Sequence, residues 1–144
     1  MQITRQADYA VRATLYLSHL GPNVRTSTAQ IAREQSIPPT FLAKIVAQLA
    51  SAGVVRATRG ARGGVKLARP PEEISLLEII EAIDGPMLLN ECVAEPDRCP
   101  LSENCPVRSV WCEAQMNLVA QLSQTNFGQL MKADSLRPTQ LMPA

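Results

Sequence analysis

Four cysteines grouped in one stretch are the residues of this chain best suited to chemistry. They lie at Cys92, Cys99, Cys105 and Cys112, and the 144-residue chain contains no others. Thiolates bind iron–sulfur clusters and zinc alike. No gap is the two-residue gap typical of zinc ribbons, and the spacing is that of neither common ferredoxin pattern. Because all four fall between positions 92 and 112, they favour a shared metal or redox site over unrelated buried cysteines.

The segment around these cysteines is rich in proline and acidic residues, so residues 87–105 are expected to form a loop that can wrap around a cluster. Pro100 and Pro106 each follow a cysteine and keep that cysteine's backbone extended. The N-terminal sequence MQITRQADYA lacks the apolar core of a signal peptide, which predicts a cytoplasmic protein. No apolar run reaches the roughly 18 residues that a membrane-spanning helix needs. In the cytoplasm such a cysteine group indicates metal or redox chemistry more than disulfides.

The charges are distributed unevenly along the chain. Residues 1–70 contain ten Lys or Arg and two Asp or Glu, a net of +8, whereas residues 71–144 contain four and eleven, a net of −7. A basic half suggests a polyanionic partner, although charge alone fits a solvated basic face equally well. Only 3% of residues are aromatic, which argues against the base-stacking platforms of single-strand RNA readers.

The elements that must position these groups begin with three helices. The spacing of apolar residues predicts helices over 5–20, 28–35 and 39–51. Thr4 and Ser27 are suitable N-caps for the first two, and Pro39 suits the first turn of the third. A longer helix followed by two helices joined by a tight turn is the helix-turn-helix arrangement.

A predicted β-hairpin follows directly and makes that arrangement more specific. Residues 53–58 and 65–69 are typical of strands, and the sequence RGARGG is typical of the turn between them. A hairpin after a helix-turn-helix is a wing. Glycines allow a close approach to another surface, and Arg59 and Arg62 can enter a narrow minor groove. Helix pair, hairpin and charge together favour DNA binding over an ordinary exposed hairpin.

The second half is predicted to be helical on both sides of the cysteine loop. Ser75 and Glu78 form a capping box for a helix over 75–84. Pro106 opens a long helix to about residue 125, and a second subunit is expected to cover its apolar stripe. That stripe consists of Val107, Val110, Trp111, Ala114, Leu118 and Leu122.

These elements predict a mainly α fold, a winged helix-turn-helix with a two-stranded wing and a long C-terminal dimerisation helix. The predicted units are a DNA-binding domain over 1–71, a connecting helix over 72–86, a cluster-binding loop over 87–105, a dimerisation helix over 106–130 and a disordered tail over 131–144. The sequence has no phosphate loop and no nucleophile with an identifiable base. His19, the only histidine, is expected to be a packed or surface residue. We therefore expect neither catalysis nor a small-molecule substrate.

Several segments resemble the Rrf-type (Rrf-two) family of winged-helix regulators, which includes the iron–sulfur cluster regulator, the nitric-oxide-sensing repressor and the rhizobial iron regulator. The resemblance covers roughly residues 1–130. It rests on MQITRQADYAVRA, on RATRGARGGVKLAR, on LLEIIEAIDGP, and on the cysteines followed by PVRSVW. Two features depart from the family pattern. The first gap between cysteines is six residues where five is usual, and Arg108 stands where some members have a histidine ligand.

The resemblance implies a homodimer with one iron–sulfur cluster per subunit, 4Fe–4S or 2Fe–2S, held by Cys92, Cys99 and Cys105. Cluster state would control the affinity for double-stranded operator DNA, with helix 39–51 in the major groove and the wing in the minor groove. The implied DNA-contacting residues are Thr40, Lys44, Arg56, Arg59, Arg62, Gly63, Gly64 and Lys66.

Two residues compete for the place of the fourth cluster ligand. Nitric-oxide-sensing members have an aspartate at the position of Asp8 that reaches the other subunit's cluster, although Asp8 also suits a helical first turn paired with Arg12. Cys105 and Cys112, if both lie on one helix, have Cα atoms about 10.5 Å apart along its axis, which is too far for one small cluster. Cys112 is nevertheless the softer ligand. Geometry and resemblance together favour Asp8.

The sequence therefore predicts a DNA-binding regulator, a repressor, whose cluster senses nitric oxide, redox state or iron supply. Two alternatives stay open. An iron–sulfur electron-transfer protein would need neither the wing nor the basic half. A metal-free or zinc-bound regulator that acts through a partner protein would leave the loop cysteines dispensable.

Overall fold

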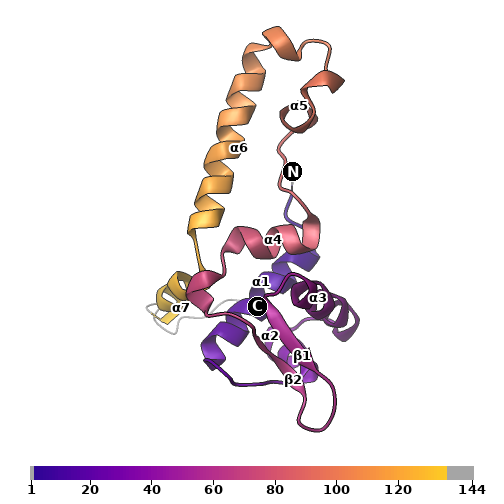
Figure 1. Cartoon of the computed structure of the whole chain (residues 1–144), viewed down its shortest axis with the longest axis vertical. Coiled ribbons are helices and arrows are strands. Elements are labelled where there is room, and N and C mark those ends of the chain that lie inside the picture. The colour runs from indigo at the N-terminus through magenta and orange to yellow at the C-terminus, as the bar shows by residue number, and fades with distance from the viewer. Residues whose placement is uncertain (1, 136–144) are drawn as a thin grey trace.

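The computed structural model describes residues 2–135. They form a helical head that carries a wing, and an arm, residues 87–124, that projects from the head (Figure 1). No helix in this part is both long and apolar enough to cross a membrane. The helices are α1 (Arg5–Leu20), α2 (Thr28–Gln35), α3 (Pro39–Ser51), α4 (Leu76–Asp84), α5 (Glu91–Ala94), α6 (Pro106–Gln124) and α7 (Phe127–Ser135). The strands are β1 (Val55–Thr58) and β2 (Gly64–Leu67), and the 3-10 turns are η1 (Pro71–Glu73), η2 (Pro96–Arg98) and η3 (Ser102–Asn104).

The first three helices begin and end where the sequence predicts. The Thr4 hydroxyl accepts a hydrogen bond from the Ala7 amide at 3.1 Å, and Ser27 accepts from the Gln30 amide at 3.0 Å. Between α2 and α3 the chain turns at Ser36, whose φ of 52° and ψ of 46° are left-handed. These local signals set the helix-turn-helix, because each cap satisfies an amide that the helix itself leaves free.

The wing is an antiparallel pair in which Val55 lies opposite Leu67 and Thr58 opposite Gly64. A feature that the sequence did not predict strengthens it. Thr26, in the loop before α2, pairs with Val65 through amide–carbonyl bonds of 3.0 Å and 2.7 Å. The loop before the helix-turn-helix therefore holds one edge of the wing.

The core of the head is aliphatic, as the composition requires, with one aromatic ring added from the far end of the chain. The residues without exposed surface include Ile31, Ile45, Ile74, Ile79 and Phe127. Helix α4 lies across this core, and the Ser75 hydroxyl caps it by accepting from the Glu78 amide at 3.1 Å. The second half of the predicted capping box is not made, because the Glu78 carboxylate pairs with Arg69 instead.

The predicted loop over 87–105 contains one short helix and two 3-10 turns, α5, η2 and η3. The Ser102 hydroxyl donates to the Pro96 carbonyl at 2.6 Å and closes this segment on itself. Helix α6 then runs the length of the arm (Figure 1).

The long helix predicted from Pro106 to about residue 125 is confirmed, because α6 ends at Gln124 and Thr125 takes extended angles of φ −93° and ψ 115°. The predicted boundaries beyond it are wrong, because the dimerisation unit predicted over 106–130 also contains the first residues of α7. Residues 131–135 of the predicted tail belong to α7, which follows a turn at Asn126. The physical reason is tertiary: the Phe127 ring is completely buried in the head, and its amide donates to the Ile74 carbonyl at 3.1 Å. The rest of the predicted tail, 136–144, lies outside the described residues.

Candidate functional site

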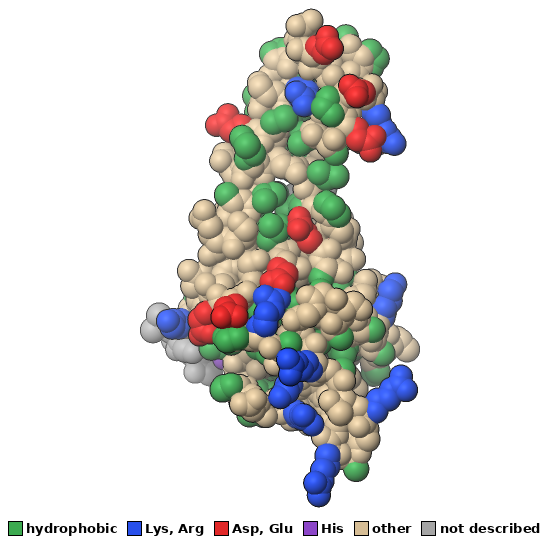
Figure 2. Space-filling model, viewed as in Figure 1, with side chains coloured by type: hydrophobic (Ala, Val, Ile, Leu, Met, Phe, Trp, Pro, Cys, Tyr) green, Lys and Arg blue, Asp and Glu red, His purple; other side chains and the backbone are tan. Residues whose placement is uncertain are grey.

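Basic side chains gather at the wing end of the molecule, whereas acidic side chains lie over the arm and around α4 (Figure 2). Arg59 and Arg62 are exposed in the wing turn. The Arg62 carbonyl accepts a hydrogen bond from Arg25 at 3.2 Å, so the loop before α2 also braces the wing tip. This brings three guanidinium groups to one end of the head, where they could meet the phosphates of DNA.

The wing glycines are required by the wing itself. A Cβ on Gly63 would lie 2.1 Å from the Thr58 carbonyl oxygen, which is backbone and cannot move aside. Gly64 has a φ of +148°, and its Cβ would lie 2.9 Å from the Thr26 oxygen. These positions therefore need glycine whether or not DNA approaches them.

The outer face of the strands carries two cations in direct opposition. Arg56 on β1 pairs in register with Lys66 on β2, while the neighbouring Val55 and Val65 are buried against the head. Like charges directly opposite each other repel and destabilise a hairpin. An anionic partner on this face would relieve that repulsion.

Helix α3 buries its apolar face and leaves the opposite face open. Leu42, Ile45 and Leu49 are buried, whereas Thr40 and Lys44 are exposed. The structure therefore leaves both predicted DNA-contacting residues of α3 accessible. Helix α3 itself lies close to α2 and the wing in the head (Figure 1).

Two basic residues of the first half direct their charge into the protein. Arg12 pairs with Asp8 at 3.2 Å, donates to the Gln35 carbonyl at 3.0 Å and lies 4.8 Å from the centre of the Tyr9 ring. Arg69 is bound by Glu78 and by two carbonyls.

Asp8 keeps 59% of its side chain exposed in the first turn of α1. It therefore forms the ordinary i, i+4 pair with Arg12 and still presents its carboxylate to the surface.

All four cysteines are free thiols, and all are half-buried in the arm. Arg108, which cannot bind iron, donates to the Cys92 carbonyl at 3.0 Å and ties the start of α6 to α5. Gln115 donates to the Met87 carbonyl at 2.6 Å and accepts from the Leu89 amide at 2.7 Å. Cys112 lies on the same face of α6 as these two residues, which is the face toward the loop.

The four cysteines suit an iron–sulfur cluster by their chemistry, because thiolates are its typical ligands. Their arrangement in the single chain is less complete. Among residues 2–135, no three His, Cys, Asp or Glu side chains lie close enough together to hold a metal ion. The arm therefore contains all four cysteines, Cys92, Cys99, Cys105 and Cys112, but they do not meet in one metal site.

The predicted apolar stripe of α6 is left largely uncovered. Val107, Val110 and Trp111 are 48%, 57% and 41% exposed. No residue of α6 is fully buried. Leu118 and Leu122, nearer the head, are half-buried.

Sequence reasoning missed the residues that brace these regions, namely Arg25, Thr26, Arg69, Arg108 and Gln115. A one-residue β-bridge or a side chain that binds a distant carbonyl leaves no periodic signal in the sequence. Arg108 is a partial exception, because the sequence places it where some family members have a histidine ligand.

A helix-turn-helix followed by a two-stranded wing with a basic outer surface defines the winged-helix class of DNA-binding proteins. The Rrf2 family, described as iron-dependent transcriptional regulators, matches residues 3–133, and this chain belongs to that family.

Individual relatives agree with this assignment. Protein aau3 of Rhizobium meliloti (strain 1021) is 33% identical over 135 residues, which cover 92% of this chain and 86% of that protein. CymR, the global cysteine regulator of B. subtilis, is 25% identical, with a TM-score of 0.73 over 92% of this chain and 98% of CymR. IscR of T. potens has a TM-score of 0.75 over 97% of this chain and 94% of its own, and at 22% identity that similarity shows the fold alone.

Proposed function

We propose that this transcriptional regulator is a homodimeric, cytoplasmic repressor whose cysteine-rich arm holds an iron–sulfur cluster that controls operator binding. The observation that carries the proposal is the grouping of four half-buried thiols on an arm joined to the DNA-binding head. The join is polar and close: the Leu76 amide donates to the Thr125 carbonyl at 2.8 Å, and the Phe127 amide donates to the Ile74 carbonyl at 3.1 Å. The family's description as iron-dependent supports the same reading.

In this proposal α3 enters the major groove with Thr40 and Lys44, and the wing enters the minor groove with Arg59 and Arg62. The remaining proposed contacts are Arg56, Gly63, Gly64 and Lys66. The opposed cations on the two strands and the accessible face of α3 support these assignments.

The proposed cluster ligands are Cys92, Cys99 and Cys105, with Asp8 of the partner subunit as the fourth ligand and Cys112 as its alternative. When bound, a cluster of this kind reacts with nitric oxide or oxidants, or is lost when iron is scarce. Since one chain does not bring three ligands together, loading requires the 87–105 segment to close and the second subunit to contribute. A segment that closes around its ligand would change the conformation of the arm, and the arm is joined to the head.

The test is anaerobic purification of the full chain, followed by absorption spectroscopy and iron and sulfide analysis. A brown protein with acid-labile sulfide, whose operator affinity changes when the cluster is removed, is the expected result. A colourless protein with stoichiometric zinc would overturn the cluster assignment and leave the DNA-binding assignment standing.

The same spectra decide the fourth ligand. Asp8→Ala is expected to make the cluster labile and to change its circular dichroism, while Cys112→Ser leaves the spectrum nearly intact. The reverse pattern would assign the fourth position to Cys112.

A thiol-based regulator without a resident metal is the second candidate. Two observations favour it: the cysteines of the described chain are not assembled into a site, and the fold is shared with a regulator named for cysteine. This candidate predicts that metal-free protein binds its operator as tightly as anaerobically purified protein does.

A further inference from the structure

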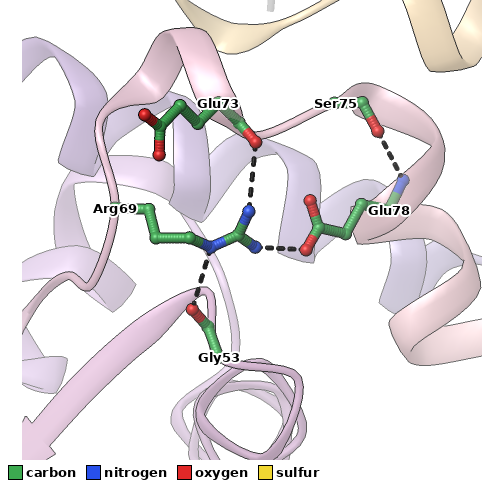
Figure 3. Close-up of polar contacts among 5 residues, drawn as sticks. All are labelled: Gly53, Arg69, Glu73, Ser75 and Glu78. Carbon is green, nitrogen blue, oxygen red and sulfur yellow. Dashed lines mark hydrogen bonds and ion pairs between the residues drawn. The ribbon is translucent and has the colours of Figure 1, made fainter.

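Arg69 lies two residues after β2, where the wing returns to the head, and all its contacts are internal. Its guanidinium makes three hydrogen bonds: Nε to the Gly53 carbonyl at 3.3 Å, Nη1 to the Glu73 carbonyl at 3.0 Å, and Nη2 to the Glu78 carboxylate (Figure 3). The side chains of Arg69 and Glu78 are each only 32% exposed. Because a guanidinium is a rigid planar fork, three partners in three directions fix its orientation.

The three partners belong to separate elements. Gly53 lies between the end of α3 and the start of β1, at a φ of +75° that suits glycine. Glu73 ends η1, and Glu78 lies in the first turn of α4. A single side chain therefore connects the junction between α3 and the wing to α4.

Helix α4 is in turn joined to the base of the arm at its N-terminal end. The Leu76 amide donates to the Thr125 carbonyl at 2.8 Å, and the Ile74 carbonyl accepts from the Phe127 amide at 3.1 Å. At its other end Asp84 accepts from the Thr4 amide at 3.2 Å. Between the arm and the DNA-binding elements there is thus an unbroken polar path through α4 and Arg69.

We infer that Arg69 is a positioning residue for DNA binding: it holds α3 and the wing in a set orientation on α4 and does not itself neutralise a phosphate. To reach DNA, its guanidinium would have to leave Glu78 and both carbonyls. This inference rests on the DNA-binding function of the head, and it is independent of what the cysteines hold.

The two possible roles of Arg69 predict opposite outcomes when Glu78 is changed. If Arg69 contacted phosphate, Glu78→Gln would free a positive charge and strengthen DNA binding. If Arg69 positions α3 and the wing, Glu78→Gln weakens the contact that orients the Arg69 guanidinium. DNA binding then becomes weaker, although the protein becomes less acidic. The Ser75 cap survives this change, because the bond is donated by the Glu78 backbone amide.

The experiment uses the full-length chain and a duplex that this chain selects from a random-sequence library. Dissociation constants are measured over a range of salt concentrations for wild type, Arg69→Gln, Glu78→Gln and the double variant. Glu73→Gln is the matched control: it removes the same charge nearby, but Glu73 binds Arg69 through its backbone carbonyl and its carboxylate points away (Figure 3).

We expect both single variants to weaken binding about 2- to 30-fold with an unchanged salt dependence, the double variant to be no worse than either, and Glu73→Gln to behave as wild type. A salt slope reduced by about one unit in Arg69→Gln, or stronger binding by Glu78→Gln, would make Arg69 a phosphate contact and overturn the inference. Unchanged affinity in both single variants would also overturn it. If Arg69→Gln does not fold, Glu78→Gln alone decides by the sign of its effect. Failure of the wild type to select any duplex would refute the proposed DNA binding instead.

Discussion

The head and the arm bury their apolar side chains to very different extents. In the head, residues from α1, α2, α3, α4 and α7 close around a core in which Ile31, Ile45 and Phe127 have no exposed surface. In the arm, α6 has no buried residue, and Val110 keeps 57% of its surface exposed. The two regions are nonetheless joined by backbone hydrogen bonds at Thr125 and Phe127.

This difference supports the proposal that the head is complete within one chain and that a second subunit covers the arm. A helix with an uncovered apolar stripe is stable in water mainly when another surface packs on it. Substitutions in the head should therefore change the stability of the single chain, whereas substitutions on the arm stripe should change association.

The largest expected effect is the loss of the Phe127 ring, which α7 buries in the head. Phe127→Ala should lower the free energy of unfolding by about 3–5 kcal/mol, because it leaves a cavity among packed aliphatic residues. Denaturant unfolding measures this. Met116→Ala, at a 65% exposed position of α6, should change it by less than about 0.5 kcal/mol. Equal losses in the two variants would show that head and arm do not differ in this way.

The next effect concerns association through the arm. For the homodimer proposed above, Leu118→Asp should raise the dissociation constant about 100-fold, because it places a carboxylate in the apolar stripe that the second subunit would cover. Sedimentation measures the association, and circular dichroism should show an intact head. Met116→Asp is the matched control, since two residues turn a helix by about 200° and place the charge on another face. If both variants stay dimeric, the stripe is not the interface.

A smaller effect is expected at the wing tip. Arg62→Ala should weaken DNA binding and reduce the salt slope by about one unit if Arg62 neutralises one phosphate. If Arg62 reads minor-groove width instead, the loss should be about 1–3 kcal/mol and confined to A·T-rich sequences. Arg98→Ala removes the same charge from the arm, where Arg98 pairs with Glu95, and should leave binding unchanged. Unchanged affinity on every sequence would remove Arg62 from the DNA interface.

The smallest effect is expected where α7 meets α1 at the surface. His19 is exposed there, as the sequence allowed, and its Nε2 lies 2.9 Å from Asp134. Asp134→Ala should change the free energy of unfolding by no more than about 1 kcal/mol, because a polar contact between partly exposed side chains contributes little. Thermal unfolding measures this. A loss as large as that of Phe127→Ala would mean that this pair, and not the buried ring, anchors α7.

Much of the head could be predicted because its signals are local. Thr4, Ser27 and Ser75 cap helices within three residues of themselves, and the turn glycines lie inside the wing that needs them. The helix α7 could not be predicted, because no residue near Phe127 indicates that its partner is Ile74, which lies more than fifty residues earlier in the chain. The site shows the same division: the family resemblance implied a role for Lys44, but no local signal in the sequence indicated that Arg69 binds Glu78.

The sequence by itself determined the three N-terminal helices, the wing and the grouping of four cysteines, since caps, periodicity and spacing act over a few residues. Only the tertiary structure decided that Thr26 joins the wing, that α7 returns to the head, and that Arg69 binds Glu78 and not solvent. Each of these depends on segments that are distant in the chain and meet only when the core has formed. The distribution of charge shows the same division: the sequence contains ten basic residues in the first half, and the fold binds the guanidinium groups of Arg12 and Arg69 to other groups of the protein.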